Sequence, residues 1–143
     1  MTIPDVLLTP LKIIRDERGS VMHMMRADAP YFKSFGEIYF STVNPGVTKA
    51  WKLHASAVGN VAVIDGRLKF VLCDRRETSP SKGTIMEVEL GLENYQLLTI
   101  PPGIVYGWKN AEDKPAMLAN CSSELWRADE SKNLPADAIP YQW

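Results

Sequence analysis

The chain has 143 residues, 45% of them hydrophobic and 23% charged, and its formal net charge at pH 7 is −1. These values are typical of one globular domain, which we expect to span residues 1–143. A net charge this small provides no overall attraction to nucleic acid or anionic membrane, so an anionic ligand requires a local basic cluster. No apolar run approaches the ~20 residues of a membrane-spanning helix, and the start lacks the pattern of a signal peptide. We therefore expect a cytoplasmic protein that binds neither nucleic acid nor membrane.

Metal binding is not indicated by the cysteines or the histidines. Cys73 and Cys121 lack Cys-x-x-Cys spacing and lie in apolar surroundings, which is typical of small buried side chains. The two histidines, His23 and His54, are far apart and form no His-x-His motif. A metal-binding barrel needs two or three histidines and a carboxylate around one ion, so we expect no metal site.

Most of the chain is predicted to form short strands separated by turns. Apolar alternation, β-branched and aromatic residues and the positions of glycine and proline predict strands at 11–14, 21–25, 36–43, 47–54, 60–64, 67–73, 85–90, 95–100, 105–109 and 116–121. The Asp65-Gly66 dipeptide predicts a hairpin between two of these strands. Helical turns are expected, if anywhere, at 30–34 and 125–131.

This pattern favours an all-β protein. Many short strands at close spacing, without helices between them, are typical of an antiparallel sandwich or barrel. We predict a cupin-like antiparallel jelly-roll β-barrel, because that fold protects its sheet edges and encloses a ligand cavity. The two ends of the chain are expected to be extended arms that pack on the barrel or on a neighbouring subunit.

The sequence TKAWKLH, residues 48–54, contains the strongest candidate for chemistry. Lys52 and His54 are two residues apart, so on a strand both side chains leave the same face. Trp51 and Leu53 would then occupy the other face. The residues alone allow two interpretations, which are a solvated outer surface and a polar pair inside the barrel. If the pair lies inside, the outer face needs a cover, for which we expect the second sheet or a neighbouring subunit.

Four stretches resemble the family of dTDP-4-dehydrorhamnose 3,5-epimerases and related nucleotide-sugar enzymes. The family's early Asp-x-Arg-Gly is matched by residues 16–19, and its Gly-Val-Leu-Arg-Gly-Leu-His strand is matched loosely by 46–52. Its Asp-x-Arg-x-x-Ser-Pro-x-x-Gly run is matched by 74–83, and its Ile-Pro-x-Gly-x-x-His-Gly-Phe by 100–108. The order of the four motifs makes the resemblance specific, although each motif alone is weak.

The resemblance implies a cupin-like barrel, a homodimer, and activity without metal or cofactor on a 4-keto sugar attached to a nucleoside diphosphate. In such a reaction the ketone acidifies the neighbouring C–H bonds, a base removes a proton, and the enolate oxygen needs a positive charge or a hydrogen-bond donor. The family uses a histidine as base, a tyrosine as the opposing acid and a lysine near the oxyanion.

These roles fall on three residues of this chain. An ungapped match places Lys52 at the position of the family's histidine, whereas a shift of two residues places His54 there. We expect His54 to be the base and Lys52 to stabilise the enolate, and the reversed assignment stays open. Tyr106, at the family's Pro-x-Gly-x-x-His position, is the candidate acid.

Four further residues are candidates for substrate binding. Arg18 and Lys49 match family arginines that hold the diphosphate, in the case of Arg18 across the dimer. Gly59 or Asn60 replaces a family lysine, and Asn60 is the candidate. Asn120 opens the segment from which the family's tyrosine is missing.

The resemblance also has gaps. The family's C-terminal aspartate, which orients the histidine, lies in an extension that this shorter chain lacks. An epimerase acting at C3, C5 or both is the first choice. The alternatives are a nucleotide-sugar 3,4-ketoisomerase and a sugar-binding cupin without catalytic activity.

Overall fold

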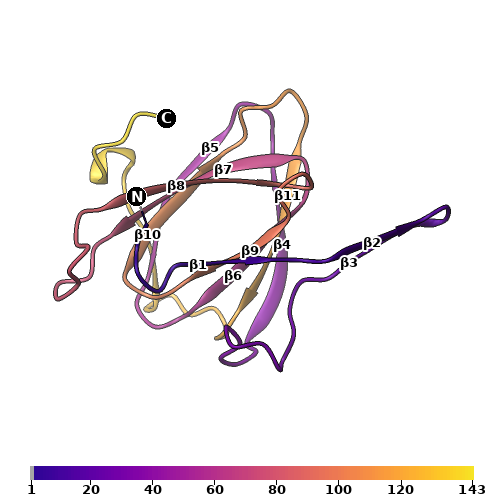
Figure 1. The fold of residues 1–143 in the computed structure, drawn as a ribbon. Helices are drawn as coiled ribbons and strands as arrows, with labels where there is room; N and C mark the ends of the chain where they lie inside the picture. The colour runs from indigo at the N-terminus through magenta and orange to yellow at the C-terminus, as the bar shows by residue number, and fades with distance from the viewer. Residues whose placement is uncertain (1) are drawn as a thin grey trace.

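Two antiparallel five-stranded sheets pack face to face in the computed structural model, which describes residues 2–143 (Figure 1). The strands are β1 Leu7–Pro10, β2 Ile13–Asp16, β3 Gly19–Met22, β4 Glu37–Val43, β5 Thr48–His54, β6 Gly59–Asp65, β7 Arg67–Asp74, β8 Ile85–Gly91, β9 Gln96–Ile100, β10 Ile104–Lys109, β11 Ala116–Ser122 and β12 Ser131–Asn133. The order in one sheet, called the β4 sheet, is β1-β9-β6-β11-β4. The order in the other, the β5 sheet, is β12-β5-β10-β7-β8.

The main core lies between the two sheets. It draws apolar side chains from alternate positions of strands in both, among them Val61, Leu98 and Leu118 from the β4 sheet and Phe70 and Ile104 from the β5 sheet. Burial of alternate residues explains why these strands show apolar alternation in the sequence. The prediction of an all-β, cupin-like antiparallel jelly roll is confirmed.

The strands from β4 to β11 were predicted to within one or two residues, but one predicted pairing is wrong. Asp65-Gly66 does not join a hairpin, because β6 belongs to the β4 sheet and β7 to the β5 sheet. The turn carries the chain from one sheet to the other, with Gly66 at a φ of 75° that favours glycine. The dipeptide therefore marks a turn correctly but does not specify which strands pair.

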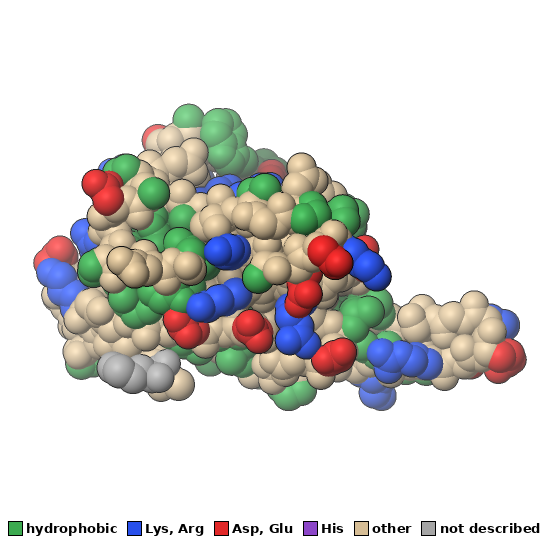
Figure 2. All heavy atoms as spheres, turned by 90° about the horizontal axis from the view of Figure 1, so that it is seen from above, with side chains coloured by type: hydrophobic (Ala, Val, Ile, Leu, Met, Phe, Trp, Pro, Cys, Tyr) green, Lys and Arg blue, Asp and Glu red, His purple; other side chains and the backbone are tan. Residues whose placement is uncertain are grey.

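The N-terminal region forms an edge strand and a projecting hairpin. β1 pairs with β9 at one edge of the β4 sheet. β2 and β3 pair only with each other and form a hairpin, called the arm, that extends well beyond the barrel (Figure 1). Figure 2 shows the same projection, with charged side chains gathered at its end.

The C-terminal segment 134–143, called the strap, covers the outer face of β5. Ile139 is buried there in a cluster with Trp51, and the indole Nε1 of Trp51 donates to the carbonyl of Ala136 at 3.0 Å. The expectation that a second sheet or a neighbouring subunit covers this face is wrong, because the chain's own strap does so. The helical turns expected at 30–34 and 125–131 are also not helices. The only helix within residues 2–143 is a single 3-10 turn, Ala136–Ala138.

Cys73 and Cys121 are buried free thiols, as predicted. In the described part of the chain, no helix has the length and apolar character needed to cross a membrane.

Candidate active site

Lys52, His54 and Tyr106 lie together on the inner face of the β5 sheet. Tyr106 is buried in the core between the sheets, and its cross-strand partner on β5 is Lys52. The hydroxyl of Tyr106 lies 3.1 Å from Nε2 of His54. Trp51 and Leu53 pack on the opposite face, against the strap. The alternation expected for residues 51–54 is therefore present, and the polar pair occupies the inner side.

A bulge in β5 adds a fourth polar residue to this face. Tyr106 is paired with Lys52 and Trp108 with Lys49, so the register shifts between the two pairs. The shift lets Lys49 and Lys52, three residues apart, share a face. Gly107 makes room for it, because a Cβ atom there would lie 2.9 Å from both the Cβ of Ala50 and the carbonyl oxygen of Lys49.

His54 is held by a buried carboxylate that we did not predict. Oε1 of Glu130 lies 2.8 Å from Nδ1 of His54, and the Glu130 side chain is only 3% exposed. The other oxygen, Oε2, accepts hydrogen bonds from the backbone amides of Ser56 at 3.0 Å and Ala57 at 2.8 Å. Glu130 therefore gives His54 a carboxylate partner, although the family's C-terminal aspartate is missing from this chain. Glu130 lies immediately before β12, which pairs with β5 and brings the carboxylate to the ring.

Electrostatics keep this carboxylate ionised. Burial alone would raise the pKa of Glu130, but hydrogen bonds from His54 and from the amides of Ala57 and Ser56 outweigh it and lower the pKa to about 2. An ionised carboxylate at Nδ1 accepts the Nδ1 hydrogen and thereby fixes the tautomer of a neutral imidazole. Nε2 then carries a lone pair on the side of the barrel interior, where it can accept a hydrogen bond or a proton.

Tyr106 lies on the same wall as His54. Burial, together with the charges of Tyr39 and Glu130, raises the pKa of Tyr106 well above its usual range. The phenol therefore stays protonated and donates to Nε2 of His54. This contact makes Tyr106 a neighbour of the predicted base and not a group that faces it across the interior.

Lys52 is a partly desolvated cation. Burial, followed by the nearby charge of Lys49, lowers the pKa of Lys52. Its Nζ lies 6.0 Å from the centroid of the Trp108 ring, at cation–π distance. Lys49 reaches β4 instead, where its Nζ donates to the carbonyl of Thr42 at 2.9 Å.

The β4 sheet contributes Tyr39 and Asn120 to the facing wall. Asn120 alternates with the core residues Ala116 and Leu118 of β11, and its Nδ2 donates to the hydroxyl of Tyr39 at 2.8 Å. Two buried atoms of this interior, Oδ1 of Asn120 and Nε1 of Trp108, find no hydrogen-bond partner within residues 2–143. Neither Tyr39 nor Trp108 was a sequence candidate, because each belongs to a strand that is aromatic for reasons of packing.

Two predicted residues lie away from this group. Asn60 alternates with the core residues Val61 and Val63, so it faces outward, where its Oδ1 accepts from Thr99 at 2.7 Å. Arg18 lies at the end of the arm, 83% exposed and paired with Asp16 at 2.7 Å. Within one chain the structure does not bring either residue to His54.

The best-matched motif, residues 74–83, builds a loop. Asp74 is fully buried, and its carboxylate accepts hydrogen bonds from Arg76, Ser79 and Ser81. Arg76 also pairs with Asp5 at 2.9 Å, which ties the N-terminus to the loop. The side chains of this motif therefore hold the loop and the N-terminus in place, and none of these hydrogen bonds involves His54, Lys52 or Tyr106.

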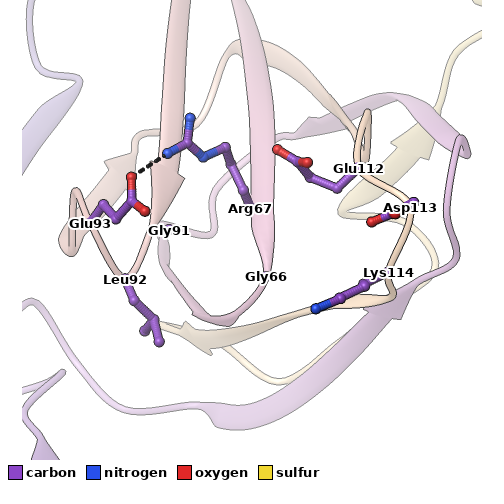
Figure 3. Close-up of a pocket in the computed structure, with 8 residues that line it drawn as sticks. All are labelled: Gly66, Arg67, Gly91, Leu92, Glu93, Glu112, Asp113 and Lys114. Carbon is purple, nitrogen blue, oxygen red and sulfur yellow. Dashed lines mark hydrogen bonds and ion pairs between the residues drawn. The ribbon is translucent and has the colours of Figure 1, made fainter.

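A hollow of about 350 Å³ lies among the loops that precede β7, β9 and β11 (Figure 3). It is lined by Gly66, Arg67, Gly91, Leu92, Glu93, Glu112, Asp113 and Lys114. Arg67 and Glu93 pair with each other at 2.8 Å, and none of the predicted site residues lines the hollow. Across residues 2–143, no group of three or more His, Cys, Asp or Glu side chains is arranged to hold a metal ion.

Comparisons with known proteins agree with this description. The family model described as dTDP-4-dehydrorhamnose 3,5-epimerase matches residues 1–143. A probable low-salt glycan biosynthesis epimerase of Haloferax volcanii is 30% identical over 141 residues, covering 97% of this chain and 88% of that protein.

Solved structures show the same similarity. The dTDP sugar isomerase of Desulfovibrio desulfuricans superposes with a TM-score of 0.95 and 44% identity, over 99% of this chain and 92% of that one. The dTDP-6-deoxy-D-glucose-3,5-epimerase of Legionella pneumophila, solved with dTDP-4-keto-L-rhamnose, has a TM-score of 0.85 and 23% identity, over 95% and 76% of the two chains. The latter match establishes a shared fold.

Proposed function

Since the chain belongs to the dTDP-4-dehydrorhamnose 3,5-epimerase family, we propose that it epimerises a 4-keto-deoxy sugar linked to a nucleoside diphosphate. The observation that carries this proposal is the Glu130–His54 pair, with Nε2 of His54 directed into the barrel beside Lys52. An oriented imidazole next to a cation is the arrangement that proton removal beside a ketone requires.

Each group has a place in the reaction. His54 takes the proton from C3 or C5 at Nε2, and Glu130 stabilises the imidazolium that forms. The electron pair of the C–H bond moves into an enolate, whose oxygen gains negative charge. The ammonium of Lys52 stabilises that oxygen in a partly desolvated site, where charge interactions are stronger than in water. The Tyr106 hydroxyl is hydrogen-bonded to Nε2 without sugar, and it releases the lone pair of Nε2 before the C–H proton is taken.

The diphosphate is bound by basic groups on the rim. Lys49 lies on the same face as Lys52 and supplies one positive charge. Arg18 supplies a second from the arm of a neighbouring chain, because its own arm projects away from its own barrel (Figure 1). This assignment makes the protein a homodimer in which each site uses residues of both chains.

The exposed surface supports a dimer. Large apolar side chains are unusually accessible along β4 and in the segments beside it, among them Phe35, Phe40 and Trp126 at 64%, 61% and 69% exposure. The arm likewise exposes Val21 at 60%. Exposed apolar groups of this size are typical of an interface. The two free thiols are typical of a reducing compartment, and we place the enzyme in the cytoplasm.

Hydrogen–deuterium exchange tests the proposed reaction. We would incubate the protein with dTDP-4-keto-6-deoxyglucose in heavy water and follow the ring carbons by NMR. Deuterium at C3 or C5 with an inverted product supports the epimerase. Migration of the ketone indicates a 3,4-ketoisomerase, and binding without any exchange indicates a sugar-binding protein without catalytic activity.

A pair of variants links the reaction to the site. His54→Asn removes the base but keeps the size and some of the hydrogen bonding, so exchange should fall by about 10² or more while binding is kept. His23→Asn alters the other histidine of the chain, and it should catalyse deuterium exchange into the sugar at the unaltered rate. Equal exchange by both variants would contradict the assignment of His54.

A further inference from the structure

Tyr39 and Asn120 are directly opposed residues on the neighbouring strands β4 and β11. Nδ2 of Asn120 donates to the Tyr39 hydroxyl oxygen at 2.8 Å. The phenol oxygen therefore accepts from the amide, and its own O–H hydrogen is available to another acceptor. Such an arrangement prepares a phenol to donate.

The surroundings of the two residues differ in a way that suits this role. Asn120 is 5% exposed and is held within the β4 sheet, whereas Tyr39 is 38% exposed and can meet a ligand. The β4 sheet faces the β5 sheet across the shared core, so Tyr39 and His54 belong to opposite walls. The charge of Tyr39 contributes to the raised pKa of Tyr106, after burial, so the two phenols are within electrostatic reach.

We infer that Tyr39 is the acid that returns a proton to the sugar carbon on the face opposite His54, and that Asn120 positions it. This inference rests on the proposed epimerase function. It replaces Tyr106 as the acid, because Tyr106 lies on the wall of the base and is hydrogen-bonded to Nε2 of His54. A proton returned from that wall would restore the original configuration.

The reaction consists of two proton transfers, one from the sugar to His54 and one from Tyr39 to the sugar. Nε2 of His54 forms a bond to the departing proton, the C–H electron pair becomes the C=C bond of the enolate, and the ketone oxygen becomes an oxyanion. The oxyanion then re-forms the ketone, and the C=C electron pair takes the Tyr39 hydroxyl proton on the opposite face. Tyr39 is left as a phenolate, which the Asn120 amide stabilises as a hydrogen-bond donor. Water then takes the proton of the His54 imidazolium and protonates the phenolate.

Tyr39→Phe in heavy water tests the inference, because it separates proton removal from inversion. The variant retains His54, so deuterium should still enter recovered dTDP-4-keto-6-deoxyglucose with its configuration retained. Formation of the epimer should fall by about 10² or more, since the acid is gone. Tyr31→Phe is the matched control, because its hydroxyl makes one long contact of 3.3 Å outside the site.

Two results would overturn the assignment of Tyr39. One is epimer formation by Tyr39→Phe at the unaltered rate. The other is a fall of exchange and epimer formation by the same factor, which indicates damage to binding or to the base. Failure of the proposed function is distinguishable, because the unaltered protein would then neither exchange nor invert the sugar.

Asn120→Ala tests the positioning role through the ratio of epimer formation to deuterium exchange into the substrate. Loss of the amide donor should lower epimer formation by about 10-fold while exchange into the substrate is largely kept. General structural damage would lower both rates together and leave their ratio unchanged, which would contradict the role of Asn120. Thermal melting of each variant identifies loss of folding independently.

Discussion

Glu130 and His54 lie 76 positions apart in the chain, and Oε1 of the carboxylate is 2.8 Å from Nδ1 of the ring. The second oxygen of Glu130 binds the amides of Ser56 and Ala57, in the segment that leaves β5 directly after His54. One buried carboxylate therefore fixes both the ring and the backbone that follows it. His54 is the only histidine that gains such a partner within residues 2–143.

Glu130→Gln should lower turnover by about 10² or more with little change in substrate binding. The amide is uncharged and no longer stabilises the imidazolium, and its NH₂ group can meet the Ser56 and Ala57 amides as donor against donor. Steady-state kinetics on the dTDP-linked keto sugar measures the effect. Glu124→Gln, a nearby carboxylate that contacts Ser56 and Arg127, is the control. Equal turnover in both variants would contradict the role of Glu130.

The same residue should make stability depend on pH. The pKa of Glu130 is about 2 in the folded chain, against an ordinary value of 4.5. The unfolded chain therefore binds the proton first, so this contribution to the free energy of unfolding is complete above 4.5 and is lost as the pH falls towards 2.

Urea denaturation between pH 2 and 4.5 measures how steeply the free energy of unfolding changes with pH. Asp74 also has a lowered pKa, because of its hydrogen bond from Arg76. It therefore contributes to the pH dependence of stability in the unaltered chain and in Glu130→Gln alike. The difference between the unaltered chain and Glu130→Gln isolates Glu130. If the free energy of unfolding changed with pH in the same way in both proteins, folding would not stabilise the ionised form of Glu130.

The strands from β4 to β11 could be predicted because their signals are local. Alternation of apolar residues reports burial of one face, and proline or glycine marks where a strand ends. Pairing is not local, and the Asp65-Gly66 turn shows the consequence. The same dipeptide would suit a hairpin, yet here β6 pairs with β9 and β11 in one sheet, and β7 pairs with β10 and β8 in the other.

The site was predictable only where residues share a strand. Lys52 and His54 follow from spacing alone, but Glu130 lies in a stretch without periodicity and reaches His54 only because β12 pairs with β5. Tyr39 stands between Ile38 and Phe40, and the aromatic and β-branched character of this stretch predicts a strand. Nothing in the local sequence distinguishes Tyr39 as a polar site residue. Asn60 was assigned to the site by alignment with a family lysine, whereas its alternation with Val61 directs it outward.

The lowered pKa of Lys52 predicts a pH limit for the reaction. Its pKa falls below 10.5 through burial and through the charge of Lys49. If the ammonium stabilises the enolate, kcat should decrease as the pH rises through that lowered value. Lys49→Met removes the repelling charge and should move this alkaline limb to higher pH.

Lys52→Met should cut turnover by about 10² and abolish this limb. Lys132→Met, which alters an exposed lysine of the neighbouring strand β12, is the matched control. A limb that stays at the same pH in Lys49→Met would show that another group titrates.

The strap should be important for stability. Ile139 is 2% exposed and packs in the cluster of Trp51 on the outer face of β5. Ile139→Ala should therefore lower the free energy of unfolding by about 2–5 kcal/mol. Asp137→Ala, an exposed change in the same segment, should alter it by less than about 0.5 kcal/mol. Urea denaturation compares the two, and equal values would mean that the strap adds no packing energy.

Arg18 should serve the site of the neighbouring chain. Arg18→Ala by itself should weaken binding of the dTDP sugar and lower its sensitivity to salt, because one charge on the diphosphate is lost. Mixing this variant with His54→Asn distinguishes an arm that works in its own chain from one that works in its partner. In a mixed dimer with exchanged arms, one site has both His54 and the other chain's Arg18.

If the arms are exchanged, unfolding the two variants and refolding them together should restore activity. Random pairing makes about half of the dimers mixed, each with one intact site, so about a quarter of the unaltered activity should return. If Arg18 serves its own chain, every site in the mixture lacks either the arginine or the base. Activity measured well below the KM of the unaltered protein then does not rise above that of the Arg18→Ala subunits alone. Light scattering before and after mixing provides the control for assembly, since a monomer would rule out a shared site.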